Sequence, residues 1–160
     1  MAGFISGFDD QRPDTILATA DRLNAIGVDV PFLSILTPFR GTPLYEQLLS
    51  ADRILKDRDW PHYNGYNVAF RPAQMSAEQL IEAHRALWRK VFGPRSVAQR
   101  LERGRRQLSH GAMWLSLAMN GFYGLKRVTG NLPAVVPPTN AGLIDHPITH
   151  TEFMSALHQA

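Results

Sequence analysis

The stretch GFISGFDDQRPDTILATADRLNAIGVDVPFLSIL, residues 3–36, determines the order of the first elements of secondary structure. Its opening apolar run, Gly3–Phe8, predicts a buried strand. Apolar residues then recur at helical spacing as far as Gly27, which is typical of a helix C-terminus. A second run rich in β-branched and aromatic residues, Val28–Leu36, predicts another strand. A strand, a helix and a strand in this order indicate a βαβ unit, and hence an α/β fold class with a parallel sheet.

The middle of the chain carries signals for a helix, a loop and a short strand. Thr42-Pro43 supplies a capping side chain and a first-turn proline for a helix that runs through Leu49. Residues 57–61 predict a loop, and Tyr66–Phe70 predicts a short strand ended by Pro72.

A strongly amphipathic helix is expected next. Ser76 and Gln79 form a capping box at its start. Its apolar face includes His84, so this side chain is expected at the edge of a buried helix face. Gly93-Pro94 ends the helix and marks a boundary between the α/β part and a helical appendage.

The appendage is basic at first and then apolar. Residues 96–108 predict a basic helix that Gly104 interrupts. Residues 111–125 are uncharged and apolar, but they are fewer than the roughly 20 needed to cross a membrane. A Pro-rich linker over 131–142 and a short helix over 151–158 are expected at the end.

Charge is distributed unevenly although the formal net charge is only +3. Seven Arg and Lys residues lie between Arg89 and Arg106, against one acid, Glu102. This block predicts an anionic partner, either a membrane surface bound through Arg95–Arg106 or a nucleic acid. A nucleic acid is the weaker candidate, because aromatic residues are not interleaved with the basic ones. The alternative is a helical hairpin whose apolar half packs inward while the arginines stay in solvent.

Metal-ligating chemistry is sparse in this sequence. The chain has no cysteine, which excludes disulfides, thiol catalysis and cysteine-ligated metals within it. His146 and His150 are four residues apart, but Pro147 between them opposes a continuous helix, so a surface tail is favoured over a metal site. No secretory signal precedes the first strand, and a cytoplasmic location is therefore expected, peripheral to the membrane if the basic helix binds there. The sequence predicts no catalytic residue.

Two segments at the carboxyl ends of the expected strands are candidate ligand sites, because parallel α/β sheets bind ligands there. In the first, Gly3 and Gly7 leave room for a flat ligand, Ile5 offers an apolar contact, and Asp10 follows the strand. Tight packing of the strand on the helix, with Asp10 or Asp14 as the helix cap, is the alternative for this segment. In the second, Thr37–Tyr45 forms a rigid loop before a helix N-terminus, which either holds an anion or is only a capped loop.

These segments resemble motifs of radical S-adenosylmethionine enzymes. Gly3-x-Ile5-x-Gly7-x-x-Asp10 is similar to their Gly-x-Ile-x-Gly-x-x-Glu strand motif. The stretch LTPFRGTPLY at residues 36–45 resembles their Thr-Pro-x-Pro-Gly-Thr-Pro-Leu-Tyr segment, with Arg40 in place of the second proline. Residues 59–63 and 68–72, followed by Met75-Ser76 at the start of a helix, resemble the continuation in the cobalamin-binding branch. The likeness extends to about Phe92.

The resemblance implies the C-terminal portion of a partial TIM-like barrel, followed by an α-helical C-terminal region. It places Gly3, Ile5 and Gly7 against the adenosine of S-adenosylmethionine, with Asp10 near the ribose and Leu36-Thr37 at the border of the same nucleoside. In the full-length enzyme it implies S-adenosylmethionine, a 4Fe–4S cluster held by a Cys-x3-Cys-x2-Cys loop, and cobalamin held by an N-terminal domain. This chain contains neither that loop nor that domain, so it is expected to be inactive alone.

Three regions follow from these expectations: a barrel fragment over 1–92, a basic and apolar helical appendage over 93–130, and a Pro-rich linker and tail over 131–160. The expected partner of the first is the missing N-terminal half of the barrel, in the same or a separate chain. Without it, the first strand would expose an unpaired edge that favours association. The competing hypothesis is a non-enzymatic, basic amphipathic module that docks on a membrane or a partner protein.

Overall fold

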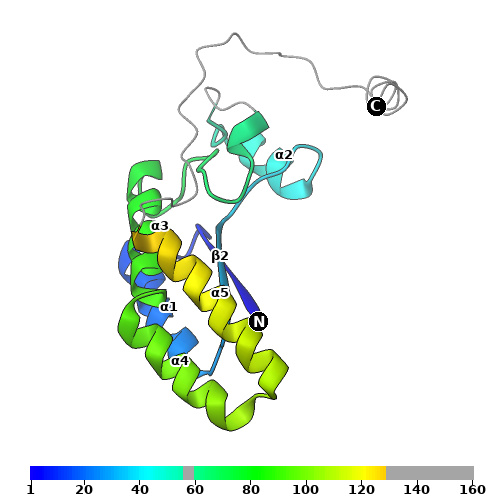
Figure 1. Cartoon of the computed structure of the whole chain (residues 1–160). Helices are drawn as coiled ribbons and strands as arrows, with labels where there is room; N and C mark the ends of the chain where they lie inside the picture. The colour runs from blue at the N-terminus through cyan, green and yellow to red at the C-terminus, as the bar shows by residue number, and fades with distance from the viewer. Residues whose placement is uncertain (56–59, 129–160) are drawn as a thin grey trace, which may run out of the picture.

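The computed structural model describes residues 1–55 and 60–128 (Figure 1). Two parallel strands alternate with helices: β1 (Ala2–Ser6), α1 (Pro13–Ala25), β2 (Pro31–Ile35) and α2 (Pro43–Ser50). A short 3₁₀ helix and three α-helices follow: η1 (Trp60–His62), α3 (Ala77–Val91), α4 (Pro94–Gln107) and α5 (His110–Val128). The tail predicted over 131–160, with its linker, terminal helix and histidine pair, lies outside the described residues, as does most of the 57–61 loop.

The predicted βαβ unit is confirmed by the pairing of its strands. β1 and β2 are parallel, with Ala2 opposite Pro31 and Ser6 opposite Ile35. Both strands are shorter than the apolar runs that predicted them. Gly7 ends β1 because its φ of +112° turns the chain out of the extended conformation.

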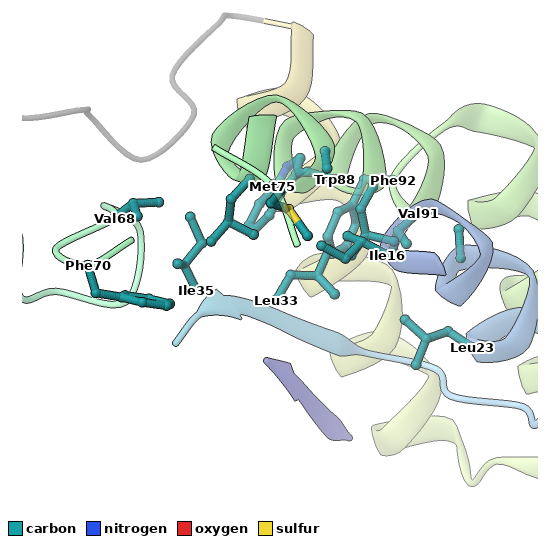
Figure 2. Close-up of a cluster of buried hydrophobic side chains, with 14 of the residues drawn as sticks. Ile16, Leu23, Leu33, Ile35, Val68, Phe70, Met75, Trp88, Val91 and Phe92 are labelled. Atoms are coloured by element: carbon teal, nitrogen blue, oxygen red, sulfur yellow. The ribbon is translucent and has the colours of Figure 1, made fainter. Parts of the chain in front are cut away.

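The core lies on one side of this sheet only. Leu33 and Ile35 point from β2 toward α1 and α3, as Figure 2 shows. They pack among buried residues of both helices, such as Ile16 and Leu87. On the other side of the sheet, Ile5 is 41% exposed. The prediction of a buried first strand is therefore wrong: only its last residue, Ser6, is buried, since no layer of the described residues covers its outer face.

Local capping signals are borne out. The Thr42 hydroxyl accepts a hydrogen bond from the Tyr45 amide at 3.3 Å and starts α2. At the start of α3, the Gln79 amide donates to the Ser76 hydroxyl at 3.2 Å, and the Ser76 amide donates to the Gln79 side chain at 2.8 Å. These bonds join residues three apart, which is why sequence spacing alone predicts them.

The strand predicted over Tyr66–Phe70 does not form. Phe70 makes a single antiparallel bridge with Ile54, and no ladder extends from it. The Asn64 side chain accepts the Tyr66 amide at 2.9 Å, and Gly65 has a φ of +80°, so the backbone turns where a strand would begin. The segment is instead a loop, exposed at Tyr66 and buried over 67–70, and the Gly65 carbonyl just before it accepts a hydrogen bond from the Ile35 amide at the carboxyl end of β2.

Gly104 does not interrupt the basic helix, contrary to prediction. α4 runs from Pro94 to Gln107, and Gly104 is buried within it. A Cβ at this position would lie 3.1 Å from the Leu108 side chain and 3.3 Å from the Met113 sulfur. The glycine is thus the point where α4 comes close to α5, and this packing offsets its low helix propensity.

Across residues 1–55 and 60–128, no helix is both long enough and apolar enough to cross a membrane.

Candidate functional site

The uncovered side of the sheet carries the first two predicted site residues. Gly3 lies opposite Phe32, and Ile5 lies opposite Ser34. We call these four residues the open face. A Cβ built on Gly3 would have no neighbouring side chain or backbone within 4 Å, and the residues Ile5 and Phe32 are each 41% exposed. Part of Phe32 is covered by Tyr123 of α5, whose ring centroid lies 6.1 Å away. A flat ligand could therefore reach the backbone at Gly3.

The outer edge of β1 is also open. The Ala2 amide donates to the Val30 carbonyl at 3.2 Å, and the Ser6 carbonyl accepts from Leu36 at 2.8 Å. In a parallel pair, alternate residues direct their amide and carbonyl groups toward the same neighbouring strand. Those of Gly3 and Ile5 therefore point to the other edge, where none of the described strands lies. This edge could accept a further strand or a hydrogen-bonding ligand.

Gly7 has a packing role in the described chain. A Cβ there would lie 3.0 Å from the Leu80 side chain, in a backbone conformation that residues with side chains rarely adopt. Its amide donates to the Gln11 side-chain oxygen at 2.7 Å, and the Phe8 amide donates to the same oxygen at 3.2 Å. Gln11 therefore occupies the amides at the end of β1. Sequence reasoning missed this residue, because a glutamine after a turn carries no specific signal.

The aspartates after β1 differ in their surroundings. Asp10 is exposed in the turn, and α1 begins after Arg12, so Asp10 is not the helix cap. Asp9 instead forms a two-pronged ion pair with Arg53, with an NH1–Oδ2 distance of 2.8 Å. Hydrogen bonding from Arg53 lowers the pKa of the Asp9 carboxyl. Sequence reasoning missed this pair, since its members are far apart along the chain.

Leu36 and Thr37 lie where β2 ends. The Leu36 amide bonds to Ser6, so these residues continue directly beyond the end of β1. The Thr37 hydroxyl donates to the Ile35 carbonyl at 3.1 Å, and the Thr42 hydroxyl donates to Phe39 at 2.7 Å. Both hydroxyls thus donate to backbone carbonyls two or three residues earlier in the chain. The adenosine contacts inferred for these residues stay a prediction.

A buried serine–histidine pair lies on the opposite side of β1 from the open face. Ser6 Oγ and His84 Nδ1 are 3.2 Å apart, and His84 is 5% exposed, which confirms its place on a buried helix face. Burial lowers the pKa of His84 to about 4, so the ring is neutral at neutral pH. The pair joins β1 to α3. No group of three His, Asp or Glu side chains suited to a metal ion occurs within the described ranges 1–55 and 60–128.

One arginine of the basic run is buried rather than solvated. Arg100 is 0% exposed. Its guanidinium donates to the Val91 carbonyl at 2.7 Å, to Asn120 Oδ1 at 2.9 Å and to Asn24 Oδ1 at 3.4 Å. It also lies over the Phe92 ring, 5.5 Å from the centroid. Arg100 therefore links α4 to the ends of α1 and α3 and to the middle of α5, so the expectation of a fully solvated basic helix is wrong at this residue.

The polar and apolar sides of α5 are arranged in the reverse of the expected order. Its polar residues Ser116 and Asn120 are buried. Asn120 Nδ2 donates to the Ser116 carbonyl at 2.8 Å and to the Asp29 carbonyl at 2.9 Å. Most of its large apolar residues are exposed, with Trp114 70% accessible. Met113, Met119 and Tyr123 are half-buried instead, and Tyr123 packs on Trp88 and Phe92. The expectation that the apolar half packs inward is therefore wrong for most of α5.

Comparison with known proteins gives one informative similarity. Over 99 residues the chain is 34% identical to the bacteriochlorophyllide d C-12(1)-methyltransferase of Chlorobaculum tepidum. The shared region is 62% of this chain but 21% of that protein, so the chain spans about a fifth of its relative's length. No protein-family model matches the chain, and no solved structure matches it. The similarity relates part of this chain to part of a methyltransferase.

Proposed function

We propose that this chain forms the C-terminal part of the barrel in a cobalamin-dependent radical S-adenosylmethionine methyltransferase. The observation that carries the proposal is the one-sided sheet. Helices cover one face of β1 and β2, whereas Gly3, Ile5 and Phe32 on the other face are exposed and the outer edge of β1 is free. In a closed α/β barrel, helices cover the outer face of the sheet, and every strand pairs with a neighbour at both edges. A sheet with one helical face, one exposed face and one unpaired edge is therefore the geometry expected of a segment of such a barrel. The partial identity to a methyltransferase supports the same assignment.

In such a barrel the open face would line the interior. Gly3 would admit the flat adenine ring, and Ile5 and Phe32 would offer apolar contacts beside it. Leu36-Thr37 and Asp10 lie at the carboxyl ends of the strands, where barrel enzymes bind their ligands. The residues present thus fit S-adenosylmethionine, which would supply the methyl group and the radical chemistry when bound.

The implied iron–sulfur cluster does not fit this chain. A 4Fe–4S cluster is held by cysteine thiolates, and the sequence contains none. Within the described ranges there is also no cluster of metal-ligating side chains. The cluster ligands therefore belong to residues outside this chain, and the share proposed for it is to shape the site and contact adenosine and substrate. By itself it is expected to be inactive.

The first experiment is to read the DNA upstream of the Met1 codon in all frames for a Cys-x3-Cys-x2-Cys loop, and to co-produce the encoded protein with this chain. We expect a stable complex that binds S-adenosylmethionine and releases 5′-deoxyadenosine after reduction, whereas either part alone does neither. Absence of any such coding region, or of binding between the two parts, would refute the assignment.

A paired substitution tests the adenosine contact separately. Gly3→Val adds a side chain where this chain offers no obstacle, so the fold should hold while S-adenosylmethionine affinity of the complex falls about tenfold. Gly111→Val is the matched control, since Gly111 also has no neighbour within 4 Å but lies on α5. If the Gly3→Val and wild-type complexes bound S-adenosylmethionine with equal affinity, the predicted contact between adenosine and the open face would be wrong. The assignment of the chain to a barrel would not be affected.

A further inference from the structure

The outward face of α5 is a continuous apolar surface. Exposed side chains spaced three and four residues apart form it, and we call the following set the α5 apolar face: Trp114, Leu115, Leu117, Ala118, Phe122 and Leu125. Leu125 is 62% exposed and Phe122 is 52% exposed. None of the proposed barrel contacts uses this surface. We propose that the α5 apolar face binds the surface of an anionic membrane, with α5 lying along the lipid headgroups.

The inverted polarity of α5 is the first support. A helix on a protein surface usually buries its apolar side and exposes its polar side. Here the polar side, with Ser116 and Asn120, is buried because Asn120 bonds to Arg100. The buried polar contact fixes which side of α5 faces inward, so the apolar side is held outward. An apolar stripe fixed in this way is typical of an interaction surface.

Charge identifies the partner. Residues 94–128 contain seven Arg and Lys residues and one acid, whereas the remainder of the chain has a net negative formal charge. α5 itself has no acid. Arg105 and Arg106, whose side chains are 71% and 73% exposed, precede its first turn. At its other end the Lys126 ammonium lies 4.8 Å from the centroid of the Phe122 ring, directly at the apolar face.

An anionic lipid surface satisfies both features at once. Apolar and aromatic side chains enter the boundary between headgroups and acyl chains, and the flanking cations bind lipid phosphates. The helix lies on such a surface rather than across it, in keeping with the absence of a spanning helix among residues 1–55 and 60–128. A second copy of the chain is a poorer partner, since two strongly basic hairpins would repel each other.

Binding of the full chain to lipid vesicles tests the inference. We expect co-sedimentation with phosphatidylcholine–phosphatidylserine vesicles, weaker binding as salt rises, and little binding to phosphatidylcholine alone. Trp114→Ser should lower the partition coefficient about tenfold, because a large apolar side chain no longer enters the lipid. Trp60→Ser is the matched control: Trp60 is 64% exposed but lies outside α5, so binding should be unchanged.

A second pair of variants tests the charges. Replacing Arg105 and Arg106 by glutamine should lower binding about fivefold per residue at low salt. The same replacement of the exposed Arg22 and Arg71 should have little effect. Circular dichroism of each variant establishes that it is folded.

Three results would overturn the inference: no binding to phosphatidylserine vesicles at low salt, equal binding to neutral vesicles, or equal losses from Trp114→Ser and Trp60→Ser. Self-association of the chain that Trp114→Ser abolishes, without vesicle binding, would assign the α5 apolar face to a second copy instead. Vesicle binding needs no S-adenosylmethionine, so its outcome is independent of the proposed enzymatic role.

Discussion

Replacing Arg100 by alanine tests how the helical appendage is attached to the rest of the fold. Its guanidinium makes its two shortest hydrogen bonds to the Val91 carbonyl, at 2.7 Å, and to Asn120 Oδ1, at 2.9 Å. Burial lowers the pKa of Arg100 to about 10, which leaves the side chain charged at neutral pH. Replacing Arg100 by alanine therefore removes a buried charge together with the hydrogen bonds that stabilise this charge in the core.

The expected loss follows from these contacts. Hydrogen bonds to a charged group contribute about 1.5–3 kcal/mol each, so these two bonds together stabilise the fold by roughly 3–6 kcal/mol before costs. Desolvation of the guanidinium offsets part of this, whereas the Val91 carbonyl and Asn120 Oδ1 would be left buried and unpaired. We expect Arg100→Ala to lower the free energy of unfolding by about 3–4 kcal/mol. Arg100→Met should lose less, because it keeps most of the volume packed on Phe92.

Urea unfolding at neutral pH, followed by far-ultraviolet circular dichroism, measures this difference. Arg95→Ala is the matched control on the same helix, since Arg95 is exposed, and it should change stability by less than about 0.5 kcal/mol. A double-mutant cycle with Asn120→Ala should give a coupling of about 1–3 kcal/mol. If Arg100→Ala and Arg95→Ala unfolded at the same urea concentration, the buried contact would not attach α4 to the core.

Three further outcomes are expected. Acidification from pH 6.5 to about 4 should lower the free energy of unfolding by about 3 kcal/mol, because His84 takes up a proton below pH 6.5 in the unfolded chain, whereas burial lowers its pKa in the fold to about 4. In His84→Asn, which can still bond to Ser6, the urea midpoint should change much less over the same pH range. Gly104→Leu should lower the free energy of unfolding by about 1–3 kcal/mol, because the larger side chain forces α5 away. Gly104→Ala should stay near wild type, since the better helix propensity of alanine offsets the tight contact. Equal melting temperatures for the two variants would contradict the close packing of α4 on α5. Gly7→Ala should lower the free energy of unfolding by about 2–3 kcal/mol, because residue 7 has a φ of +112° and its new Cβ would press on the Leu80 side chain. Gly3→Ala should leave the melting temperature unchanged.

Part of the candidate site could be predicted from alternation along β1. Side chains in a strand point to opposite faces in turn, so Gly3 and Ile5 share one face in whatever sheet this segment joins. The residues that occupy the ends of the strands could not be predicted. Gln11 binds the amides after β1, and Arg53 pairs with Asp9 from a distant part of the chain. Sequence spacing gives no signal for a contact such as the Arg53–Asp9 ion pair, whose members are far apart along the chain.

The sequence by itself determined the βαβ order and the starts of α2 and α3, because periodicity and capping act between residues a few positions apart. Thr42 and Ser76 cap their helices through residues three positions later, whatever surrounds them. Only the tertiary structure decided that Arg100 is buried, since its partners Asn24 and Asn120 come from helices at opposite ends of the described chain. Burial of that one charge turns the polar side of α5 inward and its apolar side outward, because a buried guanidinium requires hydrogen-bond acceptors and leucine or tryptophan side chains have none to offer.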